Sequence, residues 1–191
     1  MAKDGARDRI LATASRLFHE RGYSEVGINE IIESSETAKA TFYHHFPSKQ
    51  SLCQAWLESV HEHWEEIRRS ILDAPGESAD KVATFFRELG RIMTLSHFRG
   101  CPYTNTAVVV SEQESCLAKA VQSHKLSLRD FFRDLATQII PAATPREVEG
   151  LGDTLFLLYS GATTEAQNLR TLWPVEVATT AAIEICRRHT G

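Results

Sequence analysis

Hydrophobic residues recur at helical spacing along almost the whole chain, and no stretch alternates as a β-strand would. In residues 6–21, Ile10, Ala14, Leu17 and Phe18 share one helical face. Gly22 follows at the position where a glycine suits the left-handed end of a helix. The pattern predicts an all-α fold of about nine helices.

Turn and capping signals divide this pattern into segments. Pro47 breaks one run and Ser48 is a good N-cap for the next, while "DAPGES" is a clear loop. "TPRE", from Thr144, predicts a capping box with Pro145 at the first helical position. The expected helices cover about 6–21, 28–32, 38–44, 49–72, 82–93, 104–110, 115–140, 145–172 and 174–188.

The first three helices are short and have the proportions of a helix-turn-helix unit. In such a unit four side chains would pack against Leu17 and Phe18, namely Ile31, Ile32, Ala38 and Phe42. We therefore expect a DNA-binding domain at 1–48 and a helical effector-binding and dimerisation domain at 49–191, with the helix at about 49–72 linking the two.

The charge distribution singles out one segment. The chain of 191 residues has a net charge of −4, yet residues 1–50 carry seven basic and seven acidic side chains. Residues 37–57 contain no acid. The face of the third helix opposite Phe42 would display Lys39, Thr41, Tyr43 and His44, which suit phosphates and base edges of a duplex. Lys49 begins the next helix, beside amides that favour an anion.

Residues 9–57 resemble the DNA-binding domain of the TetR family of bacterial transcriptional repressors. The matching features are "LFHERGY", the isoleucines of the second helix and "KATFYHHFPSK". The resemblance implies DNA-contacting residues at Lys39, Ala40, Thr41, Tyr43, His44, His45 and Lys49. It also implies a homodimer, paired through the helices at about 145–172 and 174–188, that binds a near-palindromic double-stranded DNA operator. A small-molecule effector would shift the helix at 49–72 and release the DNA, with no enzymatic activity.

Three positions depart from the family pattern. Glu36 stands where most members have glycine, and a positive φ there costs a residue with a side chain of order 1 kcal/mol more than glycine. We therefore expect an adjusted turn at Glu36. Gly27 replaces the usual Ser or Thr cap of the second helix, and Ala38 replaces a common serine.

An effector pocket needs an apolar lining with a few polar groups. Candidate polar groups are Asn105, His124 and Gln167. The candidate apolar and aromatic lining is Trp64, Phe86, Met93, Tyr103, Phe131, Phe156 and Tyr159, and Cys101 completes the set. Cys101 lies near a helix N-terminus and Arg99, which favours a thiolate. Because a similar Gly-Cys occurs in relatives that respond to electrophiles, the resemblance implies an apolar or electrophilic effector.

The remaining patterns predict no metal, no cofactor and no membrane segment. Adjacent His44 and His45 point apart on a helix, and the four cysteines lack metal-ligand spacing. The N-terminus has no apolar run of a signal peptide, so we expect a cytoplasmic protein. Two alternatives stay open: a helical protein-interaction module with a degenerate DNA-binding domain, or an enzyme using Cys101 with His97 or His124 as base.

Overall fold

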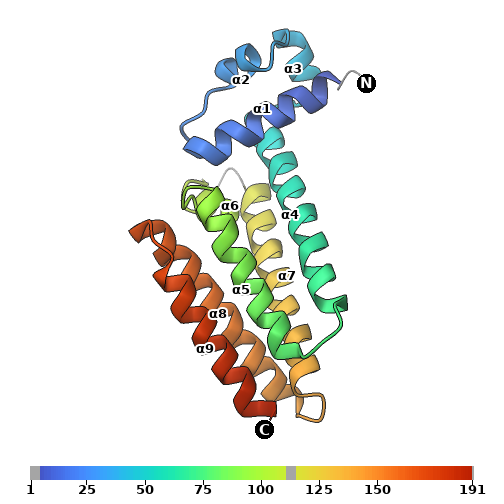
Figure 1. The fold of residues 1–191 in the computed structure, drawn as a ribbon. Helices are drawn as coiled ribbons and strands as arrows, with labels where there is room; N and C mark the ends of the chain where they lie inside the picture. The colour runs from blue at the N-terminus through green and yellow to red at the C-terminus, as the bar shows by residue number, and fades with distance from the viewer. Residues whose placement is uncertain (1–4, 111–114, 191) are drawn as a thin grey trace. The chain divides into compact units, whose positions relative to one another are not determined.

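The computed structural model describes residues 5–110 and 115–190, and within these residues it contains nine α-helices and no strand. The all-α prediction is confirmed. The helices, shown in Figure 1, are α1 (Ala6–Arg21), α2 (Ile28–Ser34), α3 (Lys39–His45), α4 (Lys49–Asp73), α5 (Ser78–Leu95), α6 (Pro102–Ala107), α7 (Ser115–Ile139), α8 (Pro145–Leu169) and α9 (Trp173–Thr190).

The chain forms two compact units. The N-terminal unit comprises residues 1–63 and 102–123, and the C-terminal unit comprises residues 64–101 and 124–191. Helices α4 and α7 therefore each contribute to both units. The expected domain boundary at residues 48–49 stays a prediction, because compactness divides the chain inside α4 instead.

In the N-terminal unit, α1, α2 and α3 enclose a small core (Figure 1). Phe18 on α1, Ile31 on α2 and Phe42 on α3 are all buried, as the spacing predicted. The prediction that Ala38 packs inward is wrong. Ala38 is exposed because it precedes α3 as an extended N-cap, with φ −73° and ψ 147°, and lies outside the helix.

The first turns of α4 belong to the same unit. Leu52, Cys53 and Leu57 are fully buried, and the Trp56 ring lies 5.4 Å from the ring of Phe18. Tyr103 on α6 donates its hydroxyl proton to the Leu57 carbonyl at 2.5 Å. This bond gives a buried phenol the partner that it needs.

The predicted helix caps are confirmed. Ser48 Oγ accepts from the Ser51 amide at 3.0 Å, at the start of α4. Thr144 Oγ1 accepts from the Glu147 amide and Glu147 accepts from the Thr144 amide, which makes the capping box reciprocal. These bonds pair amide groups that the first helical turn leaves unsatisfied.

The C-terminal unit is organised around an aromatic cluster. Phe85 and Phe86 from α5 meet Phe131 and Phe132 from α7 and Tyr159 from α8, with neighbouring ring centroids 5.0–6.4 Å apart. All five side chains are buried. Figure 1 shows α9 beside α5 and α8, and its Val175, Ala178 and Ala182 extend the same core.

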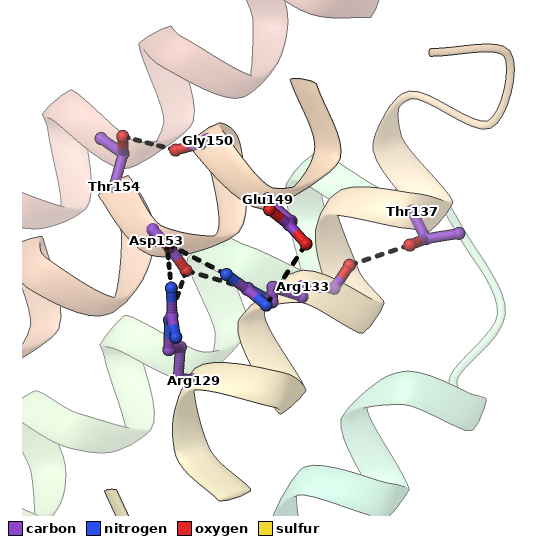
Figure 2. Close-up of polar contacts among 7 residues, drawn as sticks. All are labelled: Arg129, Arg133, Thr137, Glu149, Gly150, Asp153 and Thr154. Carbon is purple, nitrogen blue, oxygen red and sulfur yellow. Dashed lines mark hydrogen bonds and ion pairs between the residues drawn. The ribbon is translucent and has the colours of Figure 1, made fainter. Parts of the chain in front are cut away.

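Helices α7 and α8 are joined by a network of ion pairs (Figure 2). Arg129 and Arg133 both bind the Asp153 carboxylate, with N–O distances of 2.5–3.2 Å, and Arg133 also lies 3.7 Å from Glu149. The two guanidinium groups hold the pKa of Asp153 well below its usual range. The helices approach closely here, since a Cβ on Gly152 would lie 2.7 Å from the Arg133 Cα.

Candidate nucleic-acid interface

Helix α3 presents a polar face on the surface of the N-terminal unit. Phe42 is fully buried and fixes the rotation of the helix, while Tyr43 is 42% exposed. Lys39, Ala40 and His44 are exposed too, and Thr41 and His45 are partly buried. The structure thus brings the predicted contact residues of α3 together on one short element.

The turn that precedes α3 keeps a left-handed residue. Glu36 has φ 51°, so the expectation of an adjusted turn is wrong. The amide of Glu36 bonds to Glu33 O and the amide of Thr37 bonds to Ile32 O, which is the Schellman ending of a helix. This ending needs a left-handed residue after Ser35, and Glu36 adopts that conformation in place of the usual glycine.

Lys49 is the first residue of α4 and is bound within the unit. Its Nζ lies 4.5 Å from the centre of the Tyr23 ring and 3.3 Å from the Ser24 carbonyl oxygen. In the same unit, the Arg7 guanidinium at the start of α1 lies 5.5 Å from the Phe46 ring centre. Both cations are thereby placed by aromatic rings beside the ends of α1 and α3.

The chemistry of this face matches a nucleic-acid backbone. Lysine, histidine, threonine and tyrosine side chains donate hydrogen bonds to phosphate oxygens, and a short exposed helix fits a major groove. The first turn of α3 carries no acid, so the exposed helix adds no like charge against phosphate. Glu36 is the one acid in the segment 34–57 and stands just before the helix.

The predicted effector residues are divided between the two units. Tyr103 and Asn105 belong to the N-terminal unit, and the other nine belong to the C-terminal unit. Within the latter, Phe86, Met93, His124, Phe131 and Tyr159 are buried, as is Cys101, whereas Trp64, Phe156 and Gln167 are partly buried. Most of the set therefore fills the core.

Two cavities of the C-terminal unit each include one predicted residue. A cavity of about 560 Å³ between α5 and α9 is lined by Phe86, and one of about 320 Å³ between α4 and α7 is lined by Phe131. The effector site as predicted from the sequence stays a prediction.

Cys101 lies in a conformationally unusual segment. His97, Phe98 and Gly100 all have positive φ angles, of 50°, 58° and 71°. The Gln167 side chain packs so closely over Gly100 that a Cβ there would lie 1.9 Å from Gln167 Oε1. Cys101 itself is 7% exposed, and its Sγ lies 4.0 Å from Lys125 Nζ.

Tyr159 adjoins Cys101 in the core, and burial raises the pKa of its phenol far above its usual range. The phenol therefore stays protonated and acts as a hydrogen-bond donor. On α9, burial raises the pKa of the Cys186 thiol to about 11.

Sequence reasoning missed Arg68, which is only 2% exposed. Its Nη2 donates to Glu65 Oε1, and Glu65 Oε1 also accepts from Ser127 Oγ at 2.9 Å. The spacing could have revealed it, because Arg68 lies four residues after Trp64 and three before Ile71, on the inward stripe of α4.

Residues 5–110 and 115–190 contain neither a metal-binding cluster nor a membrane-spanning helix. No group of three or more His, Cys, Asp or Glu side chains in these ranges could hold a metal ion. None of the helices described there is long and apolar enough to cross a membrane.

Comparisons with known proteins agree with this reading of the N-terminal unit. Residues 10–56 match the family model for bacterial regulatory proteins of the tetR family. The HTH-type transcriptional regulator LmrA of Bacillus subtilis (strain 168) is 37% identical over 92 residues, which cover 47% of this chain and 48% of that protein. The HTH-type transcriptional repressor NemR of Escherichia coli (strain K12) is 28% identical over 83 residues, covering 43% and 42%.

The chain thus spans about half the length of these curated relatives. Solved structures extend the likeness of the fold to nearly the whole chain. The TetR-family regulator SCO4454 of Streptomyces coelicolor superposes with a TM-score of 0.82 at 24% identity, covering 97% of this chain and 90% of that one. Reduced E. coli NemR superposes with a TM-score of 0.79 at 22% identity, covering 95% and 97%.

The fold and the exposed α3 define a helix-turn-helix DNA-binding protein with a second helical unit. Residues 10–56 therefore carry a DNA-binding domain that matches the tetR family of bacterial regulatory proteins. The match in residues 10–56 favours a transcriptional regulator over the enzyme alternative.

Proposed function

We propose that this protein is a ligand-responsive, homodimeric repressor that binds a near-palindromic operator in the cytoplasm and is released by a small molecule. The observation that carries the proposal is the exposed polar face of α3, held by the fully buried Phe42. The relative NemR is itself named a transcriptional repressor.

In this proposal, Lys39, Tyr43 and His44 enter the major groove, with Ala40, Thr41 and His45 beside them. Lys49 leaves the Tyr23 ring, or contacts phosphate from that position, at the edge of the duplex. Phosphate contacts of this kind set the orientation of the helix, while contacts to base edges give sequence preference.

The pairing of two subunits is supported by apolar side chains on α8 and α9. Leu157 and Leu169 on α8 are 66% and 52% exposed, and Trp173 and Val177 on α9 are 52% and 59% exposed. Large exposed apolar side chains concentrated on two adjacent helices are typical of a protein interface. We therefore propose dimerisation through these two helices.

The effector is proposed to act at the Cys101 end of the C-terminal unit. Cys101, Tyr159 and Gln167 lie there with Lys125, whose ammonium group is 4.0 Å from the Cys101 Sγ. An electrophile that alkylates Cys101 would add bulk beside the tightly packed Gly100. This alteration would be the signal that lowers DNA affinity.

The test is a gel-shift titration with DNA flanking the protein's own gene, repeated at rising salt. We expect specific binding that weakens steeply with salt, and about tenfold or greater loss of affinity for Lys39→Ala and Tyr43→Ala. Lys119→Ala, an exposed lysine on α7, is the matched control and should behave as the parent.

Treatment with N-ethylmaleimide, an electrophile that alkylates thiols, tests the proposed effector response. Treated parent protein should lose DNA binding, and Cys101→Ser should keep it. If the untreated parent does not bind the native locus, or if Lys39→Ala and Tyr43→Ala bind as the parent does, the interaction-module alternative is favoured. Equal loss of binding by treated parent and treated Cys101→Ser would reject Cys101 as the sensor.

A further inference from the structure

The cavity between α5 and α9 takes no part in the proposed repressor mechanism. Its volume of about 560 Å³ is within the range of small-molecule sites in proteins. Its lining on α5 extends from Ala83 to Thr94, which is about 16 Å along the helix axis at 1.5 Å per residue. On the other side α9 contributes residues from Val175 to Ile183, and Figure 1 shows the two helices side by side. The cavity is therefore elongated along α5.

This cavity has an apolar lining and a charged rim. Its apolar surface comes from four buried or partly buried side chains, namely Ala83, Leu172, Val175 and Ile183. The two threonines of the lining, Thr94 and Thr179, donate their hydroxyl protons to carbonyl groups of their own helices. The charged side chains of the lining are exposed, so they lie where the cavity meets solvent. A ligand with an apolar body and a single charged end matches this arrangement.

Gly90 contributes no side chain to the lining, although it lies inside α5. Glycine in the interior of a helix lowers helix stability relative to alanine. The packing of α5 on α9 does not require it, because a Cβ at Gly90 would contact only the Val175 Cγ1, at an ordinary van der Waals distance of 3.7 Å. The glycine therefore lowers helix stability without a reason in helix packing, which indicates that the space beside it is used by a ligand.

The rim carries a cation whose charge is not matched by an acid. Arg91 is held by the Glu88 carboxylate, with its Nε 2.9 and 3.0 Å from the two oxygens. Arg87 is exposed and forms no ion pair with any residue that the structure describes. Glu176 is the one acid of the lining, against two guanidinium groups. A carboxylate bound at the rim would give Arg87 the bidentate partner that a guanidinium group favours.

The proposed dimer interface shares no side chain with this cavity. The exposed apolar side chains assigned to the interface are Leu157, Leu169, Trp173 and Val177, and none of them lines the cavity. The lining therefore favours a small molecule over a second copy of the chain.

We propose that this cavity binds an amphipathic carboxylate with a linear apolar chain. The carboxylate forms an ion pair with the Arg87 guanidinium at the rim, and the chain lies past Gly90 along the apolar lining. The elongated shape favours a linear chain over a compact ring system. Binding here requires neither chemistry at Cys101 nor contact with DNA, so the site is independent of the proposed repressor mechanism.

Calorimetric titrations of the full chain with eight-carbon probes test the class of ligand. Octanoate has the apolar chain and the carboxylate, octan-1-ol lacks the charge, and octylammonium reverses it. We expect one octanoate to bind per chain, about tenfold more tightly than octan-1-ol, a difference of about 1.4 kcal/mol. Octylammonium should bind no more tightly than octan-1-ol. Butanoate buries too little apolar surface and should show no measurable binding.

A charge variant assigns the carboxylate contact. Arg87→Gln should weaken octanoate about tenfold, to the affinity of octan-1-ol, and should leave octan-1-ol unchanged. A general loss of stability would weaken both probes alike. Arg146→Gln is the matched control, because it makes the same charge change at an exposed site on α8, and it should change neither affinity.

Two variants of Gly90 test the path of the chain. Gly90→Leu should abolish binding of octanoate and octan-1-ol, because its side chain occupies the cavity, whereas Gly90→Ala adds only a methyl group and should retain binding. Both variants should melt at or above the temperature of the parent, since leucine and alanine favour a helix more than glycine does. Loss of binding in a protein that is no less stable cannot be attributed to unfolding.

The proposal is overturned if octanoate does not bind the parent, or if octan-1-ol or octylammonium binds as tightly as octanoate. Octanoate affinity that is unchanged in Arg87→Gln or in Gly90→Leu would overturn it too. Sedimentation velocity with and without octanoate should show the same oligomeric state, and dissociation of a dimer by octanoate would assign the cavity to a second copy instead. Gel shifts with the operator are scored separately, so failure of DNA binding and failure of this cavity are distinguishable.

Discussion

At the scale of single residues, Glu36 occupies a backbone conformation that costs any residue with a side chain more than glycine. Its φ of 51° is imposed by the Schellman ending of α2, which pairs the amides of Glu36 and Thr37 with carbonyls of the preceding turn. The backbone hydrogen bonds of this ending therefore outweigh the local preference of glutamate. Glu36 is also the one acid in residues 34–57, three residues before the start of α3.

Glu36→Gly should therefore stabilise the protein by about 1 kcal/mol, measured as the free energy of unfolding in urea. It should also tighten DNA binding, because an acid beside phosphate is removed. Glu36→Gln is the matched control, since it removes the charge and keeps the strained conformation. We expect Glu36→Gln to raise DNA affinity without the gain in stability; an unstable Glu36→Gly would contradict this account of the turn.

At the scale of elements, the close contact of α7 with α8 depends on Gly152, which has no side chain. It also depends on the ion pairs of Arg129 and Arg133 with Asp153. A Cβ at Gly152 would lie 2.7 Å from the Arg133 Cα and 2.9 Å from its backbone nitrogen. Backbone cannot yield as a flexible side chain can, so the helices must separate to admit even a methyl group. A Cβ at Gly150, one half-turn away, would contact nothing within 4 Å.

Gly152→Ala should thus destabilise the protein by about 2 kcal/mol through overpacking, despite the better helix propensity of alanine. Gly150→Ala, in the same helix, should be neutral or stabilising by up to about 1 kcal/mol. Urea denaturation of the two variants beside the parent measures both values. Equal stability of Gly152→Ala and Gly150→Ala would show that the helices can separate at no cost.

The ion network makes part of this contact dependent on pH. The pKa of Asp153 is lowered in the folded state by Arg129 and Arg133, so its ionised form stabilises the fold at pH values above its ordinary pKa of about 3.9. That stabilisation is lost as pH falls toward the lowered folded-state pKa. The free energy of unfolding measured from pH 7 to pH 3 therefore reports how much these ion pairs stabilise the fold.

Asp153→Asn should lower the free energy of unfolding by about 1 kcal/mol at pH 7, since the carboxylate is a third exposed and partly screened. The difference from the parent should shrink as the pH is lowered below about 4. Glu66→Gln, at an exposed site on α4, is the control. A parent–variant difference that stays constant from pH 7 to pH 3 would assign the effect to packing instead.

At the scale of the whole molecule, we propose that the exposed apolar side chains of α8 and α9 form the dimer interface. A measurement of subunit association tests this proposal directly. A Leu157→Glu, Val177→Glu double variant places charges of the same sign where we propose two subunits meet. It should weaken dimerisation by about a hundredfold or more, because each buried unpaired charge is strongly unfavourable.

Sedimentation velocity over a concentration series measures the association. Val108→Glu, at a valine that is 79% exposed and lies outside these helices, is the control and should leave the dimer intact. In the proposed dimer two reading helices bind the operator together, so the double variant should also lose operator affinity. A double variant that remains dimeric would place the interface elsewhere.

The sequence alone was sufficient for features that depend on near neighbours. Helical periodicity identified the nine helices, the capping box at Thr144 was readable from four residues, and the buried face of α3 followed from the position of Phe42. Such features arise from contacts three or four residues apart, so the local pattern contains the necessary information.

Tertiary structure decided the features that depend on which partner a side chain meets. Glu36 keeps a left-handed conformation because the chain must turn from α2 into α3, and Ala38 is exposed because it precedes α3 as its cap. Arg68 is buried because α7 brings Ser127 beside its partner Glu65. No spacing along one helix specifies the helix packed against it, and burial, cavities and pKa shifts all follow from that packing.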